Sequence, residues 1–360
     1  MTTIRAAVCR EFGAPLTIEE VQIRAPVEGE VEVTLEAVAI CHSDITYAKG
    51  DWGGTLPAVY GHEAAGRVTA IGPGVKGLTE GERVVVTLIR HCGQCAGCAS
   101  GHPTRCEHPS HDAPPPLTSS DGGAVLAALN CGAFAEKVVV HSSQVVGVPD
   151  GVEAEQAALL ACGVITGVGA VVNSIGLRPG QDAVVIGAGG VGLNAIQGAR
   201  LAGARRIVAV DMSEAKLAAA KEFGATDGVL ATDGAPWDAA KAAMGRGADA
   251  VFVTVGAARA YDEAPRYLAQ GGRVVMVGMP AVGAVSHYEA TDVAAASQSL
   301  VGSKMGDTVI RRDIPWLADL YLQGRLKLDE LISRRWSLDE INEAIADTSG
   351  GGARRNVIVF

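Results

Sequence analysis

Residues 182–192 read DAVVIGAGGVG, an apolar run that leads directly into the pattern Gly-x-Gly-x-x-Gly. The pattern alone is a weak signal, but here it follows a predicted strand, Asp182–Ile186, and opens a predicted helix, Val191–Leu201. In that setting it is typical of a turn that binds the pyrophosphate of a dinucleotide, and a merely tight turn is the less favoured alternative. The stretch therefore predicts a Rossmann unit.

The residues of this turn have separate tasks. Gly187 allows the tight turn, Gly189 lets the backbone approach a pyrophosphate, and Gly192 lets the helix pack against the strand. Gly190 and Val191 stand at the helix N-terminus, where N–H groups and the helix dipole favour an anion. We assign all five residues to the cofactor site.

An acidic residue follows the motif by about 20 residues, as the dinucleotide pattern requires. Asp211 comes directly after the predicted strand Ile207–Val210, where its carboxylate would bind ribose hydroxyls and repel a 2′-phosphate. NAD is therefore favoured over NADP. Arg205 and Arg206 precede the strand and do not replace Asp211. Lys216, in the next predicted helix, is a candidate for the ribose, although a solvated helix lysine is the commoner case.

From about residue 165 apolar strands alternate with glycine-rich turns and alanine-rich helices, which predicts repeated βαβ units in a doubly wound parallel sheet. Further elements of this unit are the helix Glu214–Phe223 and the strands Ala250–Val255 and Arg273–Val277. We also assign Val277 to the cofactor site.

The first part of the chain has a different rhythm, with short β-rich runs separated by glycine and proline, which favours mostly antiparallel strands. These runs are Glu30–Ala39, Arg67–Ile71, Arg83–Leu88 and Glu136–Val140. The tail has two predicted helices and a closing strand: Pro315–Gln323, Leu338–Ile345 and Asn356–Phe360. Residues 101–133 are rich in proline, serine and glycine and show no strong periodicity, so we expect a long connection there.

Composition is that of a globular α/β protein. The 360 residues suggest two domains at about 150 residues each, and 48% of them are hydrophobic. A net charge of −10 without blocks of like charge argues against a nucleic-acid partner.

The N-terminus has no basic segment followed by an apolar run, so we expect a cytoplasmic protein. The uncharged stretch Gln156–Leu177 is rich in glycine and alanine and has no aromatic anchors, so we expect no membrane partner.

Four of the eight cysteines form a compact cluster with the spacing C-x2-C-x2-C-x7-C, within a lobe of about residues 91–107. Its members are Cys92, Cys95, Cys98 and Cys106. Four thiolates can close a tetrahedral cage around zinc and leave no room for substrate, so the predicted role is structural. A nucleic-acid zinc module, a disulfide pair and an iron–sulfur cluster are less favoured in an acidic cytosolic chain.

A second set of ligand types is dispersed along the chain. Cys41, His62 and Cys162 offer two thiolates and an imidazole, which leaves a fourth zinc position open for an alcohol or water. Taken separately, Cys162 is more often a small buried apolar residue, and His62 is more often a histidine satisfied within a turn.

Zinc with an open position suits the oxidation of an alcohol, because a Lewis acid lowers the pKa of the hydroxyl and polarises a carbonyl in the reverse direction. Ser43, two residues after Cys41, is then the natural proton acceptor, which would pass the proton towards the cofactor ribose and solvent. Asp44 is a candidate to orient His62 by accepting the second ring N–H.

Together these motifs resemble the zinc-dependent medium-chain alcohol dehydrogenases, close to the liver-type and thiol-dependent formaldehyde dehydrogenase branches. The resemblance extends essentially from end to end. It is carried by CHSD at residues 41–44, GHEAAG at 61–66, the four-cysteine lobe, Cys162-Gly163, the glycine motif, Asp211 and the ending RRNVIVF at 354–360.

The resemblance implies a GroES-like, β-rich catalytic domain of residues 1–162 and 303–360 around an inserted Rossmann NAD-binding domain of residues 163–302. It implies two zinc ions and one NAD for each chain, and assembly as a homodimer or homotetramer.

The resemblance also implies roles for individual residues at the catalytic metal. Cys41, His62 and Cys162 would hold the zinc, with Glu63 behind it as an alternate ligand. His42 and Arg355 would contact the pyrophosphate of NAD.

Two positions depart from the family pattern. Several relatives carry a relay histidine five residues after the first zinc cysteine, where this chain has Thr46. Glutathione-dependent relatives place an arginine four residues beyond the last lobe cysteine, where this chain has Ser110, so glutathione is not expected. Residues 117–130 and 319–326 look like the mycothiol-dependent branch.

The leading interpretation is a zinc- and NAD-dependent dehydrogenase that reversibly oxidises a primary or secondary alcohol to an aldehyde or ketone. We expect Ser43, Trp52 and Leu88 to surround the reacting oxygen, without a fixed cation. The alternative is a mycothiol- or glutathione-dependent formaldehyde dehydrogenase, which oxidises an S-hydroxymethyl thiol. A zinc-free quinone or enoyl reductase would have no use for both cysteine sets, and a non-enzymatic sensor would need no open metal position.

Overall fold

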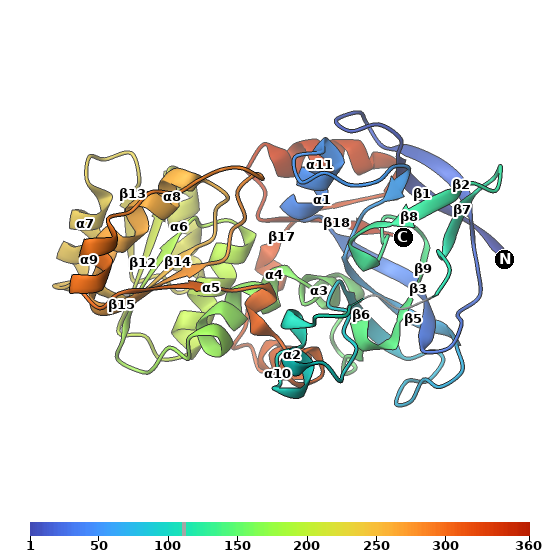
Figure 1. Cartoon of the computed structure of the whole chain (residues 1–360), viewed down its shortest axis with the longest axis horizontal. Coiled ribbons are helices and arrows are strands. Elements are labelled where there is room, and N and C mark those ends of the chain that lie inside the picture. The colour runs from blue at the N-terminus through green and yellow to red at the C-terminus, as the bar shows by residue number, and fades with distance from the viewer. Residues whose placement is uncertain (110–112) are drawn as a thin grey trace. The chain divides into compact units, whose positions relative to one another are not determined.

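The computed structural model describes residues 1–109 and 113–360, and these form two compact units (Figure 1). Unit 1 comprises Met1–Gly163 and Val309–Phe360, and unit 2 comprises Val164–Thr308. Ser110 lies outside the described residues. The α/β fold class with a β-rich unit and a Rossmann unit is confirmed.

Unit 1 is built on two β-structures. A closed barrel has the strand order β1-β2-β7-β8-β4, and a larger sheet has the order β10-β6-β5-β3-β18-β17, with β9 also paired to β3. The barrel strands are Thr2–Cys9 (β1), Thr17–Ile23 (β2), Ala58–Val59 (β4), Leu117–Ser119 (β7) and Ala124–Ala127 (β8). The strands of the larger sheet are Glu30–Ala39 (β3), Glu63–Ile71 (β5), Arg83–Thr87 (β6), Lys137–His141 (β9), Val145–Gly147 (β10), Ile332–Trp336 (β17) and Arg355–Val359 (β18).

Strand β3 organises unit 1 because it pairs with β5, β9 and β18. Its sequence, EVEVTLEAVA, is rich in β-branched and small apolar residues, and most of its side chains are buried. The core between the two β-structures includes the fully buried side chains of Ile23, Ile40 and Phe134. The closing strand β18 returns from the far end of the chain to pair antiparallel with β3, so both termini of the sequence contribute to this unit.

The helices of unit 1 lie around these sheets (Figure 1). Their bounds are His42–Lys49 (α1), Ala96–Ala99 (α2), Ala154–Leu159 (α3), Ile310–Leu322 (α10) and Ile341–Ser349 (α11). The sequence placed the start of α10 at Pro315, but the helix begins at Ile310 and contains the proline in its second turn. Proline lacks an N–H, which made it a signal for a helix start, but here it lies inside the helix and removes one of its internal hydrogen bonds.

The expectation of a connection without regular structure over residues 101–133 is wrong in part. Strands β7 and β8 form a hairpin there and complete the barrel between β2 and β4. They have three and four residues, which is too short for apolar alternation to be visible in the sequence.

Unit 2 has the fold that the glycine motif predicted. Its parallel sheet has the order β13-β12-β11-β14-β15-β16, the order of a dinucleotide-binding doubly wound sheet. The strands are Asp182–Ile186 (β11), Arg206–Asp211 (β12), Asp227–Leu230 (β13), Ala248–Val253 (β14), Leu268–Met276 (β15) and Ser299–Gly302 (β16). The helices are Gly163–Gly169 (α4), Gly190–Leu201 (α5), Glu214–Phe223 (α6), Pro236–Met244 (α7), Ala258–Glu263 (α8) and Ala290–Ala295 (α9).

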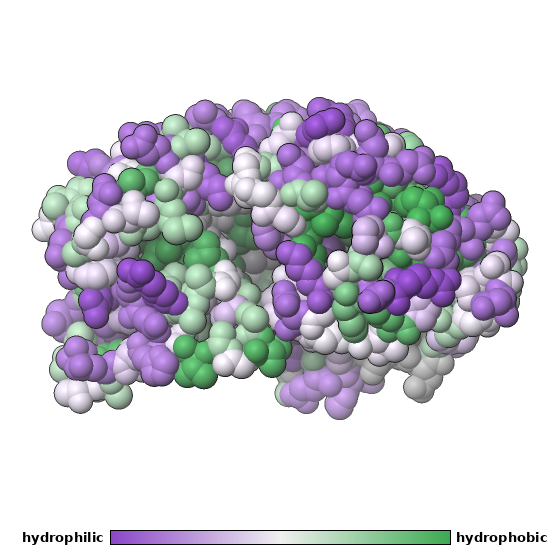
Figure 2. Space-filling view, turned by 90° about the horizontal axis from the view of Figure 1, so that it is seen from above, coloured by the Kyte–Doolittle hydropathy of each residue, from purple (hydrophilic) through white to green (hydrophobic). Residues whose placement is uncertain are grey.

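Among the described residues, no helix has both the length and the apolar character needed to cross a bilayer. The uncharged stretch Gln156–Leu177 is divided among α3, α4 and a short π-helical segment, Ala170–Ser174. Hydrophilic side chains are spread widely over the face shown in Figure 2, with hydrophobic ones in smaller groups between them.

Candidate active site

One end of the larger sheet in unit 1 gathers residues that are far apart in sequence. Ala39, at the end of β3, pairs with Glu63 at the start of β5 and with Val357 near the start of β18. Because β3 is antiparallel to both neighbours, the residue groups around Cys41, His62 and Arg355 meet at this end. The sheet register therefore brings three segments of the site together.

Two glycines make the close approach of these segments possible. Gly61 has a φ of 91°, and a Cβ on it would lie 2.6 Å from the backbone nitrogen of Phe134. Any other residue there would displace the turn that presents His62. A Cβ on Gly163 would lie 2.8 Å from Nη2 of Arg355, so this glycine gives the guanidinium room beside Cys162. The sequence showed these glycines but not the contacts that require them.

Four potential ligands form one buried cluster. Cys41, His62, Glu63 and Cys162 each offer a ligand atom, and these atoms all lie within 4.8 Å of one another. The hydrogen bond expected between His62 and Asp44 is present, with Nδ1 2.9 Å from Oδ1. Nε2 of His62 is buried and has no hydrogen-bond partner among the described residues, 1–109 and 113–360. A buried imidazole nitrogen without a proton partner, beside two cysteine sulfurs, fits a zinc ion.

The same cluster contains acidic groups whose negative charge a bound cation would compensate. A hydrogen bond with Cys162 lowers the pKa of the Cys41 thiol well below its usual value, and that bond raises the pKa of Cys162. Burial raises the pKa of the Glu63 carboxyl to about 7, against the opposing influence of the Arg355 guanidinium. Glu63 and Arg355 form a buried ion pair. Cys41, Cys162 and Glu63 therefore affect one another's ionisation in this buried space. A divalent cation would allow both cysteine sulfurs to ionise.

Ser43 and His42 lie in the first turn of α1, directly after Cys41. The Oγ atom of Ser43 lies 3.7 Å from Sγ of Cys41, and the serine is partly exposed. His42 is exposed. Thr46, at the position of the relay histidine in several relatives, donates a hydrogen bond to the His42 carbonyl at 2.8 Å. Its hydroxyl is thus engaged with the helix backbone.

The cysteine lobe forms a second, separate cluster. The ligand atoms of Cys92, Cys95, Cys98 and Cys106 lie within 4.8 Å of one another, and the four residues are partly exposed. Backbone N–H groups point at the sulfurs: Cys92 N donates to Cys106 Sγ at 3.3 Å, and Cys95 N donates to Cys92 Sγ at 3.4 Å. The backbone N–H of Glu107, together with that of Cys98, lowers the pKa of Cys95 to about 6. Such donors stabilise thiolates, so this cluster also fits zinc. No disulfide joins any of the eight cysteines, all of which are described.

In unit 2 the glycine turn has the geometry of a dinucleotide site. Gly187 has a φ of 95°, and a Cβ on Gly192 would lie 1.8 Å from the Gly187 carbonyl oxygen. A Cβ on Gly189 would meet no atom within 4 Å, so this residue faces open space. The carboxylate of Asp211 accepts hydrogen bonds from Ala188 N at 2.8 Å and Ser213 N at 3.1 Å, which fixes it beside the turn.

Two other residues assigned to the cofactor are near the same edge of the sheet. Val277 directly follows β15, and the carboxyl ends of parallel strands share one edge. Lys216, in the first turn of α6, is partly exposed.

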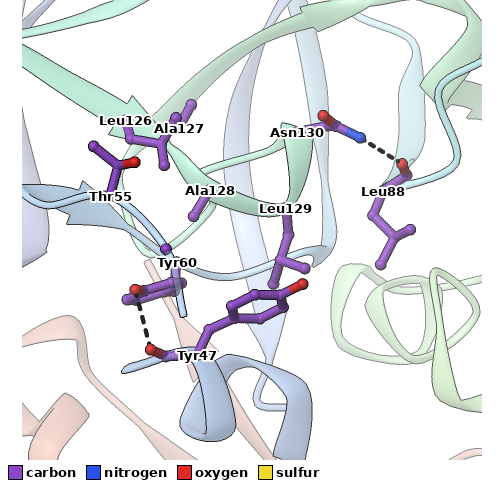
Figure 3. A pocket seen from close by; sticks show the side chains of 10 residues that line it. Tyr47, Thr55, Tyr60, Leu88, Leu126, Ala127, Ala128, Leu129 and Asn130 are labelled. Atoms are coloured by element: carbon purple, nitrogen blue, oxygen red, sulfur yellow. Dashed lines mark hydrogen bonds between the residues drawn. The ribbon is translucent and has the colours of Figure 1, made fainter. Parts of the chain in front are cut away.

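An apolar cavity of about 340 Å³ lies in unit 1 (Figure 3). Leu88 lines it together with Tyr47, Tyr60 and Leu129, whereas Ser43, which the sequence analysis placed with Leu88 around the reacting oxygen, is not among the lining residues. Trp52 packs edge-on against Tyr47, with ring centroids 5.1 Å apart, and is not among the lining residues. The sequence analysis missed both tyrosines. Tyr47 is one helical turn from Ser43, and Tyr60 is two residues before His62, so proximity to the ligand motifs was the available signal.

Residues 27–150 match the alcohol dehydrogenase GroES-like domain family, and residues 190–323 match the zinc-binding dehydrogenase family. The chain is 35% identical over 364 residues to the NDMA-dependent alcohol dehydrogenase of Amycolatopsis methanolica, covering 99% of this chain and 98% of the relative. It is 36% identical to the geraniol dehydrogenase of Castellaniella defragrans, covering 99% and 97% of the two chains.

Solved structures extend the similarity to three dimensions. An alcohol dehydrogenase zinc-binding domain protein from Burkholderia ambifaria superposes with a TM-score of 0.96 at 34% identity, covering 100% of this chain and 99% of that one. Benzyl alcohol dehydrogenase from Acinetobacter calcoaceticus superposes with a TM-score of 0.93 at 30% identity, covering 100% of both.

The two clusters predict two zinc ions for each chain, measurable by elemental analysis of the purified protein. Cys95→Ser should lose the lobe zinc and lower the melting temperature, because that ion supports an irregular lobe. Cys41→Ser should abolish turnover and leave the melting temperature much closer to that of the wild type. One zinc or none in fully active protein, or equal loss of stability in both variants, would contradict the assignment.

Asp44 should control the affinity of the buried cluster for zinc, because it fixes the ring orientation of His62. Asp44→Ala is expected to weaken zinc binding there by about 10- to 100-fold, as found for residues that orient metal-bound histidines. Competition with a chelator measures this loss. Asp51→Ala is the matched control, since Asp51 is exposed and lies just beyond the same helix. Equal zinc retention by the two variants would refute the role.

Proposed function

The chain belongs to the zinc-dependent medium-chain alcohol dehydrogenase family, and on that basis we propose that it oxidises alcohols with apolar or aromatic substituents, using NAD and no thiol cofactor. Membership makes the chain an oxidoreductase. The observation that carries the substrate proposal is the apolar cavity lined by Leu88 and Leu129, with Tyr47 one helical turn from Ser43.

We propose unit 1 as the catalytic unit and unit 2 as the NAD-binding unit. Cys41, His62 and Cys162 would hold the catalytic zinc, and the four lobe cysteines would hold the structural one. When bound, the catalytic zinc supplies a Lewis acid that makes an alcohol hydroxyl more acidic. When bound, NAD supplies the acceptor for hydride. The chain's own side chains would accept the proton of the alcohol hydroxyl and compensate the charges of the metal cluster.

Ser43 is the proposed proton acceptor for the alcohol. Its hydroxyl lies 3.7 Å from the sulfur of Cys41 and is partly exposed, so it is both near the metal cluster and open to a proton-carrying path. Thr46 donates to the His42 carbonyl, so its hydroxyl is already engaged, and Ser43 would release the proton without a relay through the Thr46 side chain. Asp44 orients His62, and Arg355 pairs with the carboxylate of Glu63.

The pyrophosphate of NAD would lie on the turn Gly187–Gly192, and Asp211 would bind the adenosine ribose. Two backbone N–H groups already hold the Asp211 carboxylate, so little reorganisation is needed when the ribose binds. The proposed contacts of His42 and Arg355 with the pyrophosphate rest on the family resemblance. Arg355 already forms the ion pair with Glu63 and would have to serve both groups with its remaining N–H donors.

The substrate class is supported by the cavity and by the names of two relatives. A geraniol dehydrogenase and a benzyl alcohol dehydrogenase are named for alcohols with large apolar substituents. We further propose, from the resemblance alone, a cytoplasmic homodimer or homotetramer. The thiol-dependent formaldehyde reaction is less specifically supported, and it enters the substrate test below as the competing outcome.

Asp211→Gly should erode the preference for NAD. Removal of the carboxylate eliminates hydrogen bonds to the ribose and the repulsion of a 2′-phosphate, so kcat/KM with NAD should fall roughly 10- to 100-fold. Steady-state kinetics with both cofactors measures the effect. Asp211→Asn is the matched variant, because it keeps the size of the side chain and one acceptor oxygen for Ala188 N, and removes the charge and the acceptor for Ser213 N. Wild-type turnover with NADP as fast as with NAD would remove the argument.

Benzyl alcohol should be oxidised with a kcat/KM at least about 10-fold above that of ethanol, since burial of an aromatic ring in an apolar cavity contributes more than burial of a methyl group. Leu88→Ala should reduce this ratio, and Leu322→Ala, which removes an exposed leucine, should not. The panel also includes formaldehyde with glutathione or mycothiol. Turnover confined to a formaldehyde and thiol mixture would replace this proposal with the thiol-dependent reaction.

A further inference from the structure

Strand β6 of the larger sheet ends in a threonine that lies beside a potential metal ligand. The strand has the sequence RVVVT, so the hydroxyl of Thr87 follows three buried valines. Thr87 pairs directly with Glu63 in the antiparallel register of β6 and β5. Side chains of directly opposite residues project from the same face of a sheet, with Cβ atoms about 5 Å apart. The threonine hydroxyl and the glutamate carboxylate are therefore neighbours.

Each of these two buried side chains has one polar atom that lacks a hydrogen-bond partner within residues 1–109 and 113–360. The two atoms are Oγ1 of Thr87 and Oε1 of Glu63. Oε2 of Glu63 is engaged by the ion pair with Arg355. A buried hydroxyl without a partner is unfavourable, and a valine would fill the same space without that cost. Packing alone therefore does not explain a hydroxyl at position 87.

The backbone that carries Thr87 has little freedom to move. Strand β6 lies between β5 and β10, and the Thr87 carbonyl accepts a hydrogen bond from Nε2 of Gln144 at 2.9 Å. Thr87 is also β-branched, which restricts its side chain to few rotamers. Glu63 has the longer side chain and is the partner that can adjust. A small rotation of the glutamate side chain, or one bridging water molecule, would join Oε1 to Oγ1 by hydrogen bonds.

The carboxylate of Glu63 also belongs to the buried metal cluster, because its ligand atom lies within 4.8 Å of the ligand atoms of the other three members. It therefore has two alternative partners once a metal ion is bound. It can coordinate the ion, or it can interact with Thr87 while Arg355 holds its other oxygen. Coordination by Glu63 would add a fourth protein ligand and close the site to an alcohol.

We propose that Thr87 is a positioning residue for Glu63: its hydroxyl, linked to Oε1 by a hydrogen bond or through one water molecule, holds the carboxylate off the catalytic zinc and keeps the fourth position open. This inference rests on the alcohol dehydrogenase function proposed above and adds a residue to the same site. The role differs from that of Asp44, because Asp44 fixes a ligand in place and Thr87 would keep one away.

The test uses protein with cobalt(II) in the buried cluster and zinc in the cysteine lobe, because the visible absorption of cobalt reports a change of ligand without NAD or turnover. Thr87→Val removes the hydroxyl and keeps the shape of the side chain. Imidazole should then bind the cobalt roughly 3- to 10-fold more weakly than in the wild type, since it must displace the Glu63 carboxylate. Thr87→Ser keeps the hydroxyl and should retain the wild-type affinity, and Thr87→Ala should behave as Thr87→Val does.

The rate at which a chelator removes the cobalt separates this role from a general effect on packing. A fourth protein ligand should slow removal about 3- to 10-fold in Thr87→Val. Damage to packing would act in the opposite direction, with faster removal and a lower melting temperature. Thr34→Val is the matched control, because Thr34 lies in β3 of the same sheet and its hydroxyl donates to Thr69 on an exposed face. Imidazole affinity and cobalt removal should not change in this control.

A double-mutant comparison shows whether Thr87 acts through Glu63. On a Glu63→Gln background, Thr87→Val should change the imidazole affinity by less than about twofold, because the carboxylate that Thr87 positions is already absent. In steady-state kinetics Thr87→Val should raise KM for benzyl alcohol more than it lowers kcat, since Glu63 would compete with the alcohol for the metal.

Unchanged imidazole affinity in Thr87→Val, or an equal loss of affinity on the Glu63→Gln background, would overturn the inference and leave the alcohol dehydrogenase function intact. Failure of the wild type to oxidise any alcohol would instead refute the proposed function. The imidazole titration would then still decide the role of Thr87, because it requires neither substrate nor NAD.

Discussion

The buried carboxylate of Asp44 is the interaction on which the geometry of the metal cluster depends. It accepts hydrogen bonds from Cys41 N at 3.1 Å, Gly61 N at 2.9 Å and His62 Nδ1 at 2.9 Å. One side chain thus joins the N-terminus of α1 to the turn before β5, two segments that each supply a ligand. With only 1% of its surface exposed, Asp44 loses its hydration, and these three donors compensate for that loss. Loss of the carboxylate would leave three buried donors unsatisfied and both ligand segments without a common anchor.

The charges around this carboxylate explain why Arg355 must return from the end of the chain. Cys41, Cys162, Glu63 and Asp44 place four acidic groups in one buried volume, and a zinc ion compensates only two negative charges. The buried pair of Arg355 with Glu63 compensates a third. Strand β18 therefore does more than close the larger sheet, because its first residue delivers the cation that opposes the effect of burial on the pKa of Glu63. This requirement links the last residues of the sequence to the first metal ligands.

The sequence predicted those features in which a local spacing of residues is specific to one kind of chemistry. The glycine turn after β11, the acidic residue at the end of β12 and the four-cysteine lobe each have a spacing that few other functions require, and their geometry follows the prediction. The hairpin of β7 and β8 was missed because its strands are too short to show periodicity. Tyr47 and Tyr60 were missed as cavity residues because apolar lining depends on contacts between distant segments, and an aromatic residue beside a motif is equally common in a core.

Asn130 shows how side-chain contacts fix the turn that lines the apolar cavity. Its Nδ2 donates to the Leu88 carbonyl at 3.2 Å, and its Oδ1 accepts from Arg90 at 2.9 Å. Leu129 and Asn130 both have a positive φ, 54° and 61°, a conformation that is unfavourable for residues other than glycine and persists only where surrounding contacts impose it. Gln144 supplies one such contact, by donating to the Asn130 carbonyl at 3.0 Å. These contacts hold the turn in place against the cost of its positive φ values, so the wall that Leu129 forms in the apolar cavity depends on residues from two other segments.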